Sequence, residues 1–422
     1  MADVLILGGG LAGTAAALQL ADLGHSAAIV EAKARLGGRA FSRSWGGDVT
    51  EYGGGWLNHR QHRMLALARR LGLGLTPRAP LTARRYGWGG TGQAAPCRPE
   101  ERAAHDAGMA LWSADKAKGD PATLCLPLAD WFGRRAIPPS ARREILAWWA
   151  ISGSADPTRT AVGELMSAKT ARGFDAKFAE MAYTVAGGVQ GLAEGAARAS
   201  GAVIALADPA ERVVVTAEGA TLTTVSGRTV TADAALVALP VNALDQIRFD
   251  PPLTGPAATP RQVGHIGRAV KLLIRARGVP PGSLITDAAH GRRFLWSEHI
   301  RPDGATLIVA FALAQDLPDP ETGSLRGAIT QAFPKAAIET IDAIDWHNWH
   351  DWHDWCADLF SRGTWDAMRA GMEAAQDPAR WTGPGRMAFA RSDLAPDAVG
   401  WFEGALASAD HAVRHLHSVL KA

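Results

Sequence analysis

Cysteine is scarce in this sequence, and both a long apolar run and a strong net charge are missing. The three cysteines, Cys97, Cys125 and Cys356, are scattered and odd in number, so they favour neither a disulfide framework nor a metal knuckle and fit a reducing compartment. No stretch approaches the ~20 consecutive apolar residues of a membrane span. The net charge of +2 argues against a strong electrostatic attraction to nucleic acid or to an anionic membrane.

The composition that remains is that of a globular protein. Hydrophobic residues make up 47% and charged residues 20%, which is ordinary for a folded chain. At 422 residues the chain is too long for one simple core and suits two interleaved domains. The first strand is predicted to start at residue 3 or 4, which leaves no room for a signal peptide, and residues 411–422 are predicted as a polar-faced helix. We therefore expect a cytoplasmic protein without a membrane anchor.

A strand, a glycine-rich turn and a helix open the chain. Val4–Leu7 is wholly apolar, as a parallel strand covered on both faces must be, and a helix is predicted over residues 14–23. Between them lie Gly8, Gly10 and Gly13 as GxGxxG. The first glycine permits a tight turn, the second lets the backbone approach a pyrophosphate, and the third lets the helix pack close to the strand. The helix N-terminus then directs free N–H groups at the phosphates.

An acidic residue completes this unit. Residues 27–30 are predicted as a second strand that ends at Glu31, where a carboxylate can accept hydrogen bonds from a ribose. A GxGxxG alone also fits a simple tight turn. The ordered set of strand, glycines, helix, strand and acid predicts a dinucleotide site, for either NAD or FAD.

Two segments beyond Glu31 distinguish the two cofactors. Residues 35–39 read RLGGR and residues 51–56 read EYGGGW. They resemble the flavin-dependent amine oxidase family, which includes monoamine, polyamine and L-amino-acid oxidases. In that family an RxGGR element follows the ribose-binding acid, and an acid-x-Gly-Gly segment runs beneath the flavin. The resemblance implies bound FAD, with glycine main chain against the flavin where a Cβ would clash and with Arg39 offering a fork of donors.

The resemblance spans nearly the whole chain and implies an α/β fold. A Rossmann-like FAD-binding domain would be interleaved with an α+β substrate domain that contains a mixed sheet and a helical insertion. The expected segments are 1–76, 186–250 and 384–422 for the FAD-binding domain, and 77–185, with the insertion, and 251–383 for the substrate domain. Strands are predicted at residues 203–206, 213–222, 229–239 and 266–274.

Lys271 lies inside the last of these apolar stretches, where a lysine is expensive to bury without a partner. One interpretation is that it snorkels to the surface from an edge strand. The other follows from the resemblance, because the family has a lysine at the corresponding place that holds a water next to flavin N5. The resemblance favours the second. It also implies that the backbone of Ala210 contacts adenine.

Tryptophan and histidine each recur at every third residue within residues 344–355, and aspartates lie among them. Such density invites a metal site around His347, His350 and His353. A step of three fits neither a strand face nor the i,i+4 pair of a helical metal site, and no cysteine or glutamate completes a ligand set. We expect a partly exposed aromatic segment and no metal.

The segment from Trp355 to Trp365 resembles the family's stretch in which a tryptophan near the flavin leads through a Ser-x-Gly turn to an active-site aromatic residue. Some monoamine oxidases have a cysteine just before that aromatic residue, joined to the flavin. Here the position is Thr364, which implies non-covalent FAD. Two departures follow near the C-terminus, where Arg391 replaces a usual glycine and Asp393 a usual glutamate. The first puts the local backbone path in doubt, because a non-glycine residue is restricted at positive φ.

The resemblance implies a complete set of site residues. Trp365 and Trp401 would form an aromatic cage facing the flavin, with Lys271 as the third catalytic residue. A helix N-terminus near Gly400 would point at the flavin's pyrimidine end. The residues implied to bind the cofactor are Gly8, Gly10, Leu11, Ala12, Gly13, Glu31, Ala32, Lys33, Gly37, Gly38, Arg39, Gly54, Gly55, Trp56, Ala210, Trp355, Asp393, Gly400, Trp401, Phe402 and Ala405.

The implied reaction removes two electrons and a proton from a C–H bond next to an amine nitrogen. The products are an imine, which water hydrolyses to an aldehyde or ketone plus ammonia or amine, and hydrogen peroxide from O2. The protein itself supplies orientation and electrostatics. Small amines and O2 are thus the expected partners, and the sequence is compatible with a homodimer.

Three other functions remain open on the same fold. Carotenoid or protoporphyrinogen desaturases act on long or planar apolar substrates, and a flavoprotein partner without turnover is a further possibility. An L-amino-acid oxidase would need an arginine to clamp the substrate carboxylate in bidentate fashion. The candidates for that clamp are Arg84, Arg85, Arg268, Arg292 and Arg293.

Overall fold

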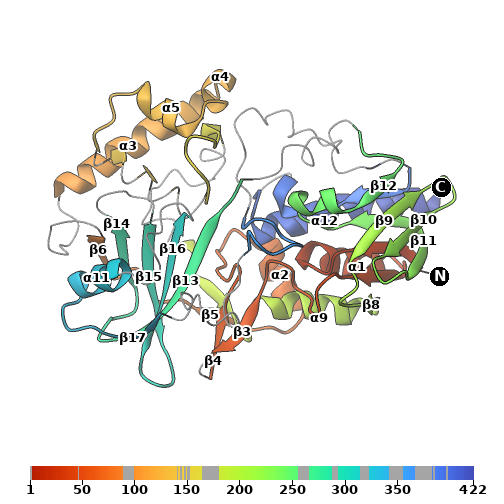
Figure 1. Cartoon of the computed structure of the whole chain (residues 1–422), viewed down its shortest axis with the longest axis horizontal. Coiled ribbons are helices and arrows are strands. Elements are labelled where there is room, and N and C mark those ends of the chain that lie inside the picture. The colour runs from red at the N-terminus through yellow and green to blue at the C-terminus, as the bar shows by residue number, and fades with distance from the viewer. Residues whose placement is uncertain are drawn as a thin grey trace.

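The structure is a computed structural model in which two sheets, each with its own helices, lie side by side (Figure 1). It describes residues 2–45, 47–88, 99–139, 141–142, 145–146, 149, 153–163, 180–254, 266–287, 293–313, 323–341, 355–365, 383, 385–395 and 398–422. Both chain ends lie at the end of the molecule that is distant from the six-stranded sheet.

The larger sheet has eight strands, ordered β12-β9-β10-β11-β1-β2-β8, with β18 paired to β11. Their bounds are β1 (Ala2–Leu7), β2 (Ala27–Val30), β8 (Val203–Ala205), β9 (Ala210–Val215), β10 (Ala220–Thr224), β11 (Thr229–Val237), β12 (Arg248–Asp250) and β18 (Met387–Phe389). The strands β8, β2, β1, β11 and β18 run parallel, and β11, β10 and β9 form an antiparallel meander. The predicted strand over residues 213–222 is wrong in one respect, because a turn between Thr216 and Gly219 divides it into β9 and β10.

Helices α1 (Leu11–Asp22), α9 (Gln190–Ser200) and α12 (Phe402–Lys421) cover this sheet, and α1 packs against the other two. The contacting faces are rich in alanine, including Ala16 of α1 and Ala409 of α12, both fully buried. Helix α1 begins three residues earlier than predicted. The glycine-rich turn therefore ends inside the first helical turn, which places Gly13 against the strand.

The second sheet has six strands in the order β17-β13-β16-β15-β14-β6. Their bounds are β6 (Ala83–Trp88), β13 (Ala269–Arg277), β14 (Ser283–Asp287), β15 (Arg293–Ile300), β16 (Thr306–Leu313) and β17 (Ala337–Ile341). All neighbours are antiparallel except β14 and β6. Every residue of β16 is buried, because the sheet is covered on both faces.

Helix α11 (Gly323–Ala332) covers one face of this sheet, and a helical group covers the other. The described members of that group are α3 (Pro99–Lys118), α4 (Pro121–Leu124) and α5 (Leu128–Gly133), at the upper left of Figure 1. Trp112, Trp131 and Trp149 form its core together with Phe294 and Phe311 from the sheet. A helical insertion was predicted here, and much of its second half, residues 164–179, lies outside the described residues.

Short elements join the two parts. They are β3 (Ser42–Trp45), β4 (Asp48–Glu51), β5 (Leu75–Pro77), β7 (Tyr183–Val185), α2 (His62–Arg70) and the 3-10 helices η1 (Val241–Gln246) and η7 (Ser392–Leu394). The chain alternates between the two sheets, and on this basis we propose the five expected segments as two interleaved domains. Among the helices of the described part, none is long and apolar enough to cross a membrane.

Candidate functional site

The turn between β1 and α1 has the form of a phosphate cradle. Gly8 has a φ of +99°, and a Cβ there would lie 2.6 Å from the carbonyl oxygen of Ala238. A Cβ on Gly13 would overlap the carbonyl oxygen of Gly8. The N–H of Thr14 donates to the carbonyl of Gly10 at 3.0 Å, and no side chain caps the helix. The N–H groups before Thr14 therefore lack partners within the helix, at its positive end.

Glu31 lies directly after β2 in the wall of a cavity and is 6% exposed. Its Oε2 accepts a hydrogen bond from the N–H of Gly9 at 2.7 Å, and its Oε1 accepts one from the N–H of Lys33 at 2.8 Å. Burial raises the pKa of the Glu31 carboxyl, and the two N–H donors act in the opposite direction. Each carboxylate oxygen can accept a further bond, so Glu31 keeps acceptor capacity for a ribose hydroxyl.

The Lys33 side chain connects this end of the cavity to the segment after residue 354. Its Nζ pairs with Asp358 and lies 5.2 Å from the ring centroid of Trp355. Burial lowers the pKa of Lys33, and the Asp358 carboxylate opposes that shift. The indole of Trp355 in turn donates to the carbonyl of Tyr52 at 3.1 Å. Three segments that are distant in sequence thus meet beside the predicted adenosine site.

Arg39, which also lines the cavity, binds three protein groups. It donates to the carbonyl of Thr364 at 2.9 Å and to the hydroxyl of Ser392 at 3.0 Å, and it forms an ion pair with Asp393. The other oxygen of Asp393 accepts the N–H of Val241 at 2.9 Å. The aspartate that replaces the family's usual glutamate therefore joins Arg39 to the start of η1.

Arg391, the second departure, lies in extended backbone with φ −162° and ψ 149°. Any residue adopts this conformation, so the sequence-based doubt about the local path is wrong. The guanidinium lies 4.7 Å from the ring centroid of Phe389.

The glycines of residues 53–55 bring main chain against neighbouring protein groups. A Cβ on Gly53 would overlap the carbonyl oxygen of Arg39, and one on Gly54 would lie 2.6 Å from the Phe402 ring. Gly54 and Gly55 line the cavity. The space that these glycines leave is thus required by Arg39 and Phe402, which are themselves cavity residues.

Helix α12 begins at the same cavity. Gly400 has a φ of +75°, and Trp401 is the N-cap without a side-chain cap hydrogen bond. The N–H groups of the first turn therefore have no partner within the helix. Glu403 of that turn faces away, because its two oxygens accept the N–H groups of Arg63 and Met64, each at 3.0 Å, and so cap α2. The positive helix end remains directed at the cavity.

Lys271 lies on β13, which pairs with β16 along its length and with β17 from Ile274 to Arg277. Its Nζ donates to the carbonyls of Glu51 and of Gly53, the latter at 2.9 Å. Burial lowers its pKa to about 8, against the opposing effect of the Glu51 and Glu298 carboxylates. The snorkelling interpretation is therefore wrong. The ammonium group of Lys271 lies in the cavity wall, and its pKa is lowered.

Aromatic side chains enclose the end of the cavity near Lys271. Phe311 is central to them, with its ring 5.6 Å from Trp365 and 5.7 Å from Trp56, both edge-on, and 5.0 Å from Phe294, stacked. Trp401 packs against the same core. The described part of this wall is largely aromatic, and Lys271 enters the cavity beside it, with its Nζ 5.7 Å from the Phe311 ring centroid.

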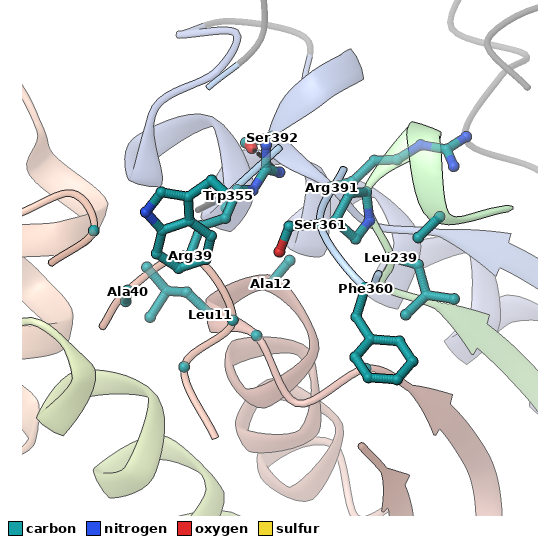
Figure 2. A pocket seen from close by; sticks show the side chains of 18 of the residues that line it. Leu11, Ala12, Arg39, Ala40, Leu239, Trp355, Phe360, Ser361, Arg391 and Ser392 are labelled. Atoms are coloured by element: carbon teal, nitrogen blue, oxygen red, sulfur yellow. Dashed lines mark hydrogen bonds between the residues drawn. The ribbon is translucent and has the colours of Figure 1, made fainter. Parts of the chain in front are cut away.

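With two exceptions, the predicted site residues line one cavity, which Figure 2 shows at close range with Trp355 and Phe360 on either side of Leu11 and Ala12. The exceptions are Gly13, which supports the turn, and Asp393, which holds Arg39. The lining contains Gly8, Gly10, Leu11, Ala12, Glu31, Ala32, Lys33, Gly37, Gly38, Arg39, Gly54, Gly55, Trp56, Ala210, Lys271, Trp355, Trp365, Gly400, Trp401, Phe402 and Ala405.

The lining also contains residues that the sequence did not identify, notably Tyr52, Met181, Phe294, Phe311 and Phe360. Tyr52 could have been found, because it lies inside the EYGGGW segment. The two phenylalanines of β15 and β16 carry no such signal, because each lies in a short apolar run, Phe294–Trp296 in β15 and Leu307–Leu313 in β16.

Several predicted features lie outside the described residues. They include the step-of-three segment up to residue 354 with His347, His350 and His353, the whole of Arg292, and the side chains of Arg84 and Arg85. Of the other arginines considered for a carboxylate clamp, Arg268 is exposed and Arg293 does not line the cavity.

Comparison with known proteins gives a consistent result. The family model described as flavin containing amine oxidoreductase matches residues 11–417. The (S)-6-hydroxynicotine oxidase of Paenarthrobacter nicotinovorans is 28% identical over 446 residues, which cover 99% of this chain and 100% of that protein. The pseudooxynicotine dehydrogenase of a Pseudomonas species is 24% identical over 99% of this chain and 87% of that protein.

Solved structures share the fold. Putrescine oxidase bound to putrescine superposes with a TM-score of 0.82 at 21% identity, over 99% of both chains. Cyclohexylamine oxidase from Brevibacterium oxydans IH-35A superposes with a TM-score of 0.79 at 21% identity, over 100% of both chains. At this identity the likeness shows the fold alone, and it confirms the predicted α/β class with its mixed sheet.

Proposed function

Since this chain belongs to the family of flavin-containing amine oxidoreductases, we propose that it oxidises a C–N bond of a small amine to an imine with O2 as the electron acceptor. Membership makes it an FAD-dependent oxidoreductase that acts on amines. We further propose that the reaction forms H2O2 and that water hydrolyses the imine to an aldehyde or ketone plus ammonia or amine. The observation that carries it is the group of aromatic side chains beside a partly buried Lys271 in the same cavity as the glycine turn.

The residues present fit FAD. The glycine turn and the start of α1 offer partner-free N–H groups for a pyrophosphate, and Glu31 offers acceptors for a ribose. The start of α12 lies on the same cavity and favours negative charge there. When bound, FAD supplies the two-electron acceptor for the C–H bond beside the amine nitrogen.

We propose that the FAD is held without a covalent bond. Thr364 occupies the position before Trp365, and its hydroxyl is 3.2 Å from Ser154 Oγ and 3.3 Å from the N–H of Ala269. A threonine hydroxyl fixed in this way does not supply the nucleophilic thiol that a thioether link needs.

The aromatic wall would select the neutral form of the substrate. An alkylammonium resembles lysine, whose pKa in water is about 10.4, and its nitrogen lone pair must be free for oxidation. Burial in an apolar site disfavours the charged form of an amine. Trp365 and Trp401 would thus orient the amine and shift its protonation, with no acid or base required for the C–H step.

The test is the visible spectrum of the purified protein before and after anaerobic addition of monoamines, polyamines and amino acids. We expect a yellow protein that one class of amine bleaches, stoichiometric H2O2 on admission of air, and yellow supernatant after acid precipitation. A yellow pellet would contradict the non-covalent proposal. A yellow protein that no amine bleaches would favour a desaturase or a flavoprotein without turnover, and bleaching by amino acids alone would favour an amino-acid oxidase.

A second candidate keeps the amine and changes the acceptor. One relative is named a dehydrogenase, which favours an acceptor other than O2 for this chain as well. Reoxidation of the bleached protein by air and by an artificial acceptor distinguishes the two candidates. The oxidase proposal predicts that air alone restores the colour within the turnover time.

Trp401→Ala is expected to lower kcat/KM for the amine by about 30-fold, as loss of a central aromatic contact does. Because Trp401 caps α12 without using its side chain, the helix start and FAD content should be preserved. Trp401→Phe is the control and should lose less. Steady-state kinetics together with flavin absorbance check this, and unchanged kinetics in the alanine variant would remove Trp401 from the amine site.

The pH dependence of the oxygen reaction should follow Lys271. Its pKa is lowered to about 8, so the cation predominates below pH 8 and is lost as the pH rises through that value. We expect the rate constant for reoxidation of bound flavin by O2 to fall across this range. Stopped-flow measurements over a pH series check this, and an equal fall in Lys271→Met would assign the titration to another group.

A further inference from the structure

A buried ion pair lies directly behind the aromatic wall. Arg78, just after β5, donates to both oxygens of Glu298 on β15, from Nε at 3.1 Å and from Nη2 at 3.0 Å. Its Nη1 donates to the carbonyl of Met181 at 2.6 Å. The side chains of Arg78 and Glu298 are only 2% and 7% exposed. Two charges removed from water to this extent require close pairing, and here the bidentate geometry supplies it.

Trp56 is the link between this ion pair and the cavity. Its indole N–H donates to Glu298 Oε1, and the guanidinium of Arg78 lies over its ring at 4.2 Å from the centroid. On its other side the indole lines the cavity and meets Phe311 edge-on at 5.7 Å. The ion pair therefore holds both the polar edge and one face of Trp56. In sequence, Trp56 is more than 220 residues from β15 and β16, so only the fold brings them together.

Lys271 lies on the same part of the cavity wall as Trp56, because its Nζ is 5.7 Å from the centroid of the Phe311 ring that Trp56 meets edge-on. Among the described residues, the charged groups that bear on the pKa of Lys271 are Glu51 from β4, Glu298 from β15 and Arg78 from the segment after β5. On β16 its register partner is the uncharged Phe311. Glu51 is partly buried, and its oxygens accept hydrogen bonds from Ser42 Oγ at 2.7 Å and from the N–H of Val189 at 2.8 Å.

We propose that Arg78 and Glu298 are positioning residues of the amine site, which fix the Trp56 indole in the cavity wall and offset one another's field at Lys271. The proposal rests on the proposed function, because it concerns the site of that reaction. Neither residue lines the cavity, so neither touches a substrate.

Removal of either charge should shift the midpoint pH of the Lys271 titration, and the two shifts should have opposite signs. Glu298→Gln removes the negative charge and leaves Arg78, so the midpoint of Lys271 titration should move to lower pH. Arg78→Met removes the positive charge and leaves Glu298, so the midpoint should move to higher pH. The double variant removes both charges and should return close to the native midpoint. If the Arg78–Glu298 pair had a purely structural role, the two single variants would not shift the Lys271 midpoint in opposite directions.

The primary measurement is a pH titration of the visible spectrum of the FAD-loaded protein without any amine. We expect shifts on the order of half a pH unit, in opposite directions for the two single variants. The matched control is the surface ion pair of Arg277 and Glu339 on the same sheet, whose Arg277→Met and Glu339→Gln variants should leave the midpoint unchanged. Shifts in one direction for both buried variants, or a native spectrum without a midpoint between about pH 7 and pH 9, would overturn the proposal.

A second measurement tests the hold on Trp56 with charge retained. Trp56→Phe removes the indole donor, and Arg78→Lys keeps the cation but loses the planar fork. Each should raise KM for the amine about fivefold, the cost of one hydrogen bond, with kcat and the spectral midpoint nearly unchanged. An unchanged KM in both would overturn the positioning role. Because the spectral titration needs no turnover, failure of every amine as a substrate would refute the proposed function and leave that titration interpretable.

Discussion

Lys271→Met is expected to slow the reaction of the reduced flavoprotein with O2 by about 100-fold, the usual cost of removing one preorganised charge from a site where charge develops. Negative charge accumulates on oxygen as it accepts electrons. The ammonium of Lys271 lies in the cavity wall, fixed by the carbonyls of Glu51 and Gly53, and is placed to stabilise that charge. Methionine has a similar volume and no charge, so the aromatic wall around it should keep its packing.

The reduction of the flavin by amine should change far less in the same variant, because that step requires no cation. Stopped-flow spectroscopy separates the two half-reactions, with anaerobic mixing for reduction and aerobic mixing for reoxidation. Lys335→Met is the matched control, since Lys335 is exposed beyond α11 and should affect neither step. Equal slowing of both half-reactions, with FAD content intact, would show that Lys271 acts on the site as a whole and not on oxygen.

The local parts of the site could be predicted from the sequence. The glycine turn and Glu31 are separated by one helix and one strand, so their order along the chain already places them together. The family resemblance extended this to both ends of the chain, and the match over residues 11–417 confirms the family. The roles of the individual site residues stay predictions.

The parts that escaped prediction depend on long-range contacts. Arg78 and Glu298 are 220 residues apart, and neither lies in a motif, so only the folded sheet brings them to Trp56. Phe294 and Phe311 lie on strands buried on both faces, where a residue facing the cavity has the same apolar character as one facing the core. Periodicity alone cannot separate these two environments.

The expectation for Arg391 failed for a different reason. Family comparison marked it as a departure because a glycine is usual there, and the concern was a positive φ. The chain instead passes through this position in extended backbone, which every residue type adopts. The departure therefore has no conformational cost at this position, and the neighbouring Asp393 still reaches Arg39.

Gly13→Ala is expected to weaken FAD binding at least about 100-fold, while the same change at Gly327 leaves it unaltered. A Cβ on Gly13 would overlap the carbonyl oxygen of Gly8 and lie 3.1 Å from Ala238 Cβ and 3.2 Å from Ile6 Cγ2. Two of these atoms belong to β1 or to the turn itself, so the start of α1 must move away from the strand. Its N–H groups then lose their position for the pyrophosphate, and overpacking costs a further ~1–3 kcal/mol of stability.

Gly327 provides the matched control because it also lies within a helix, α11, but a Cβ there would have no atom within 4 Å. Alanine is the better helix former by about 1 kcal/mol, so Gly327→Ala should raise the thermal midpoint. Fluorescence titration of each apoprotein with FAD gives the dissociation constants, and thermal melts of the apoproteins give the stabilities. Equal FAD affinity in the two variants would mean that the close approach of α1 to β1 at Gly13 does not hold the cofactor. Weak FAD binding in Gly13→Ala alone would show that the cofactor site depends on the absence of a side chain at Gly13.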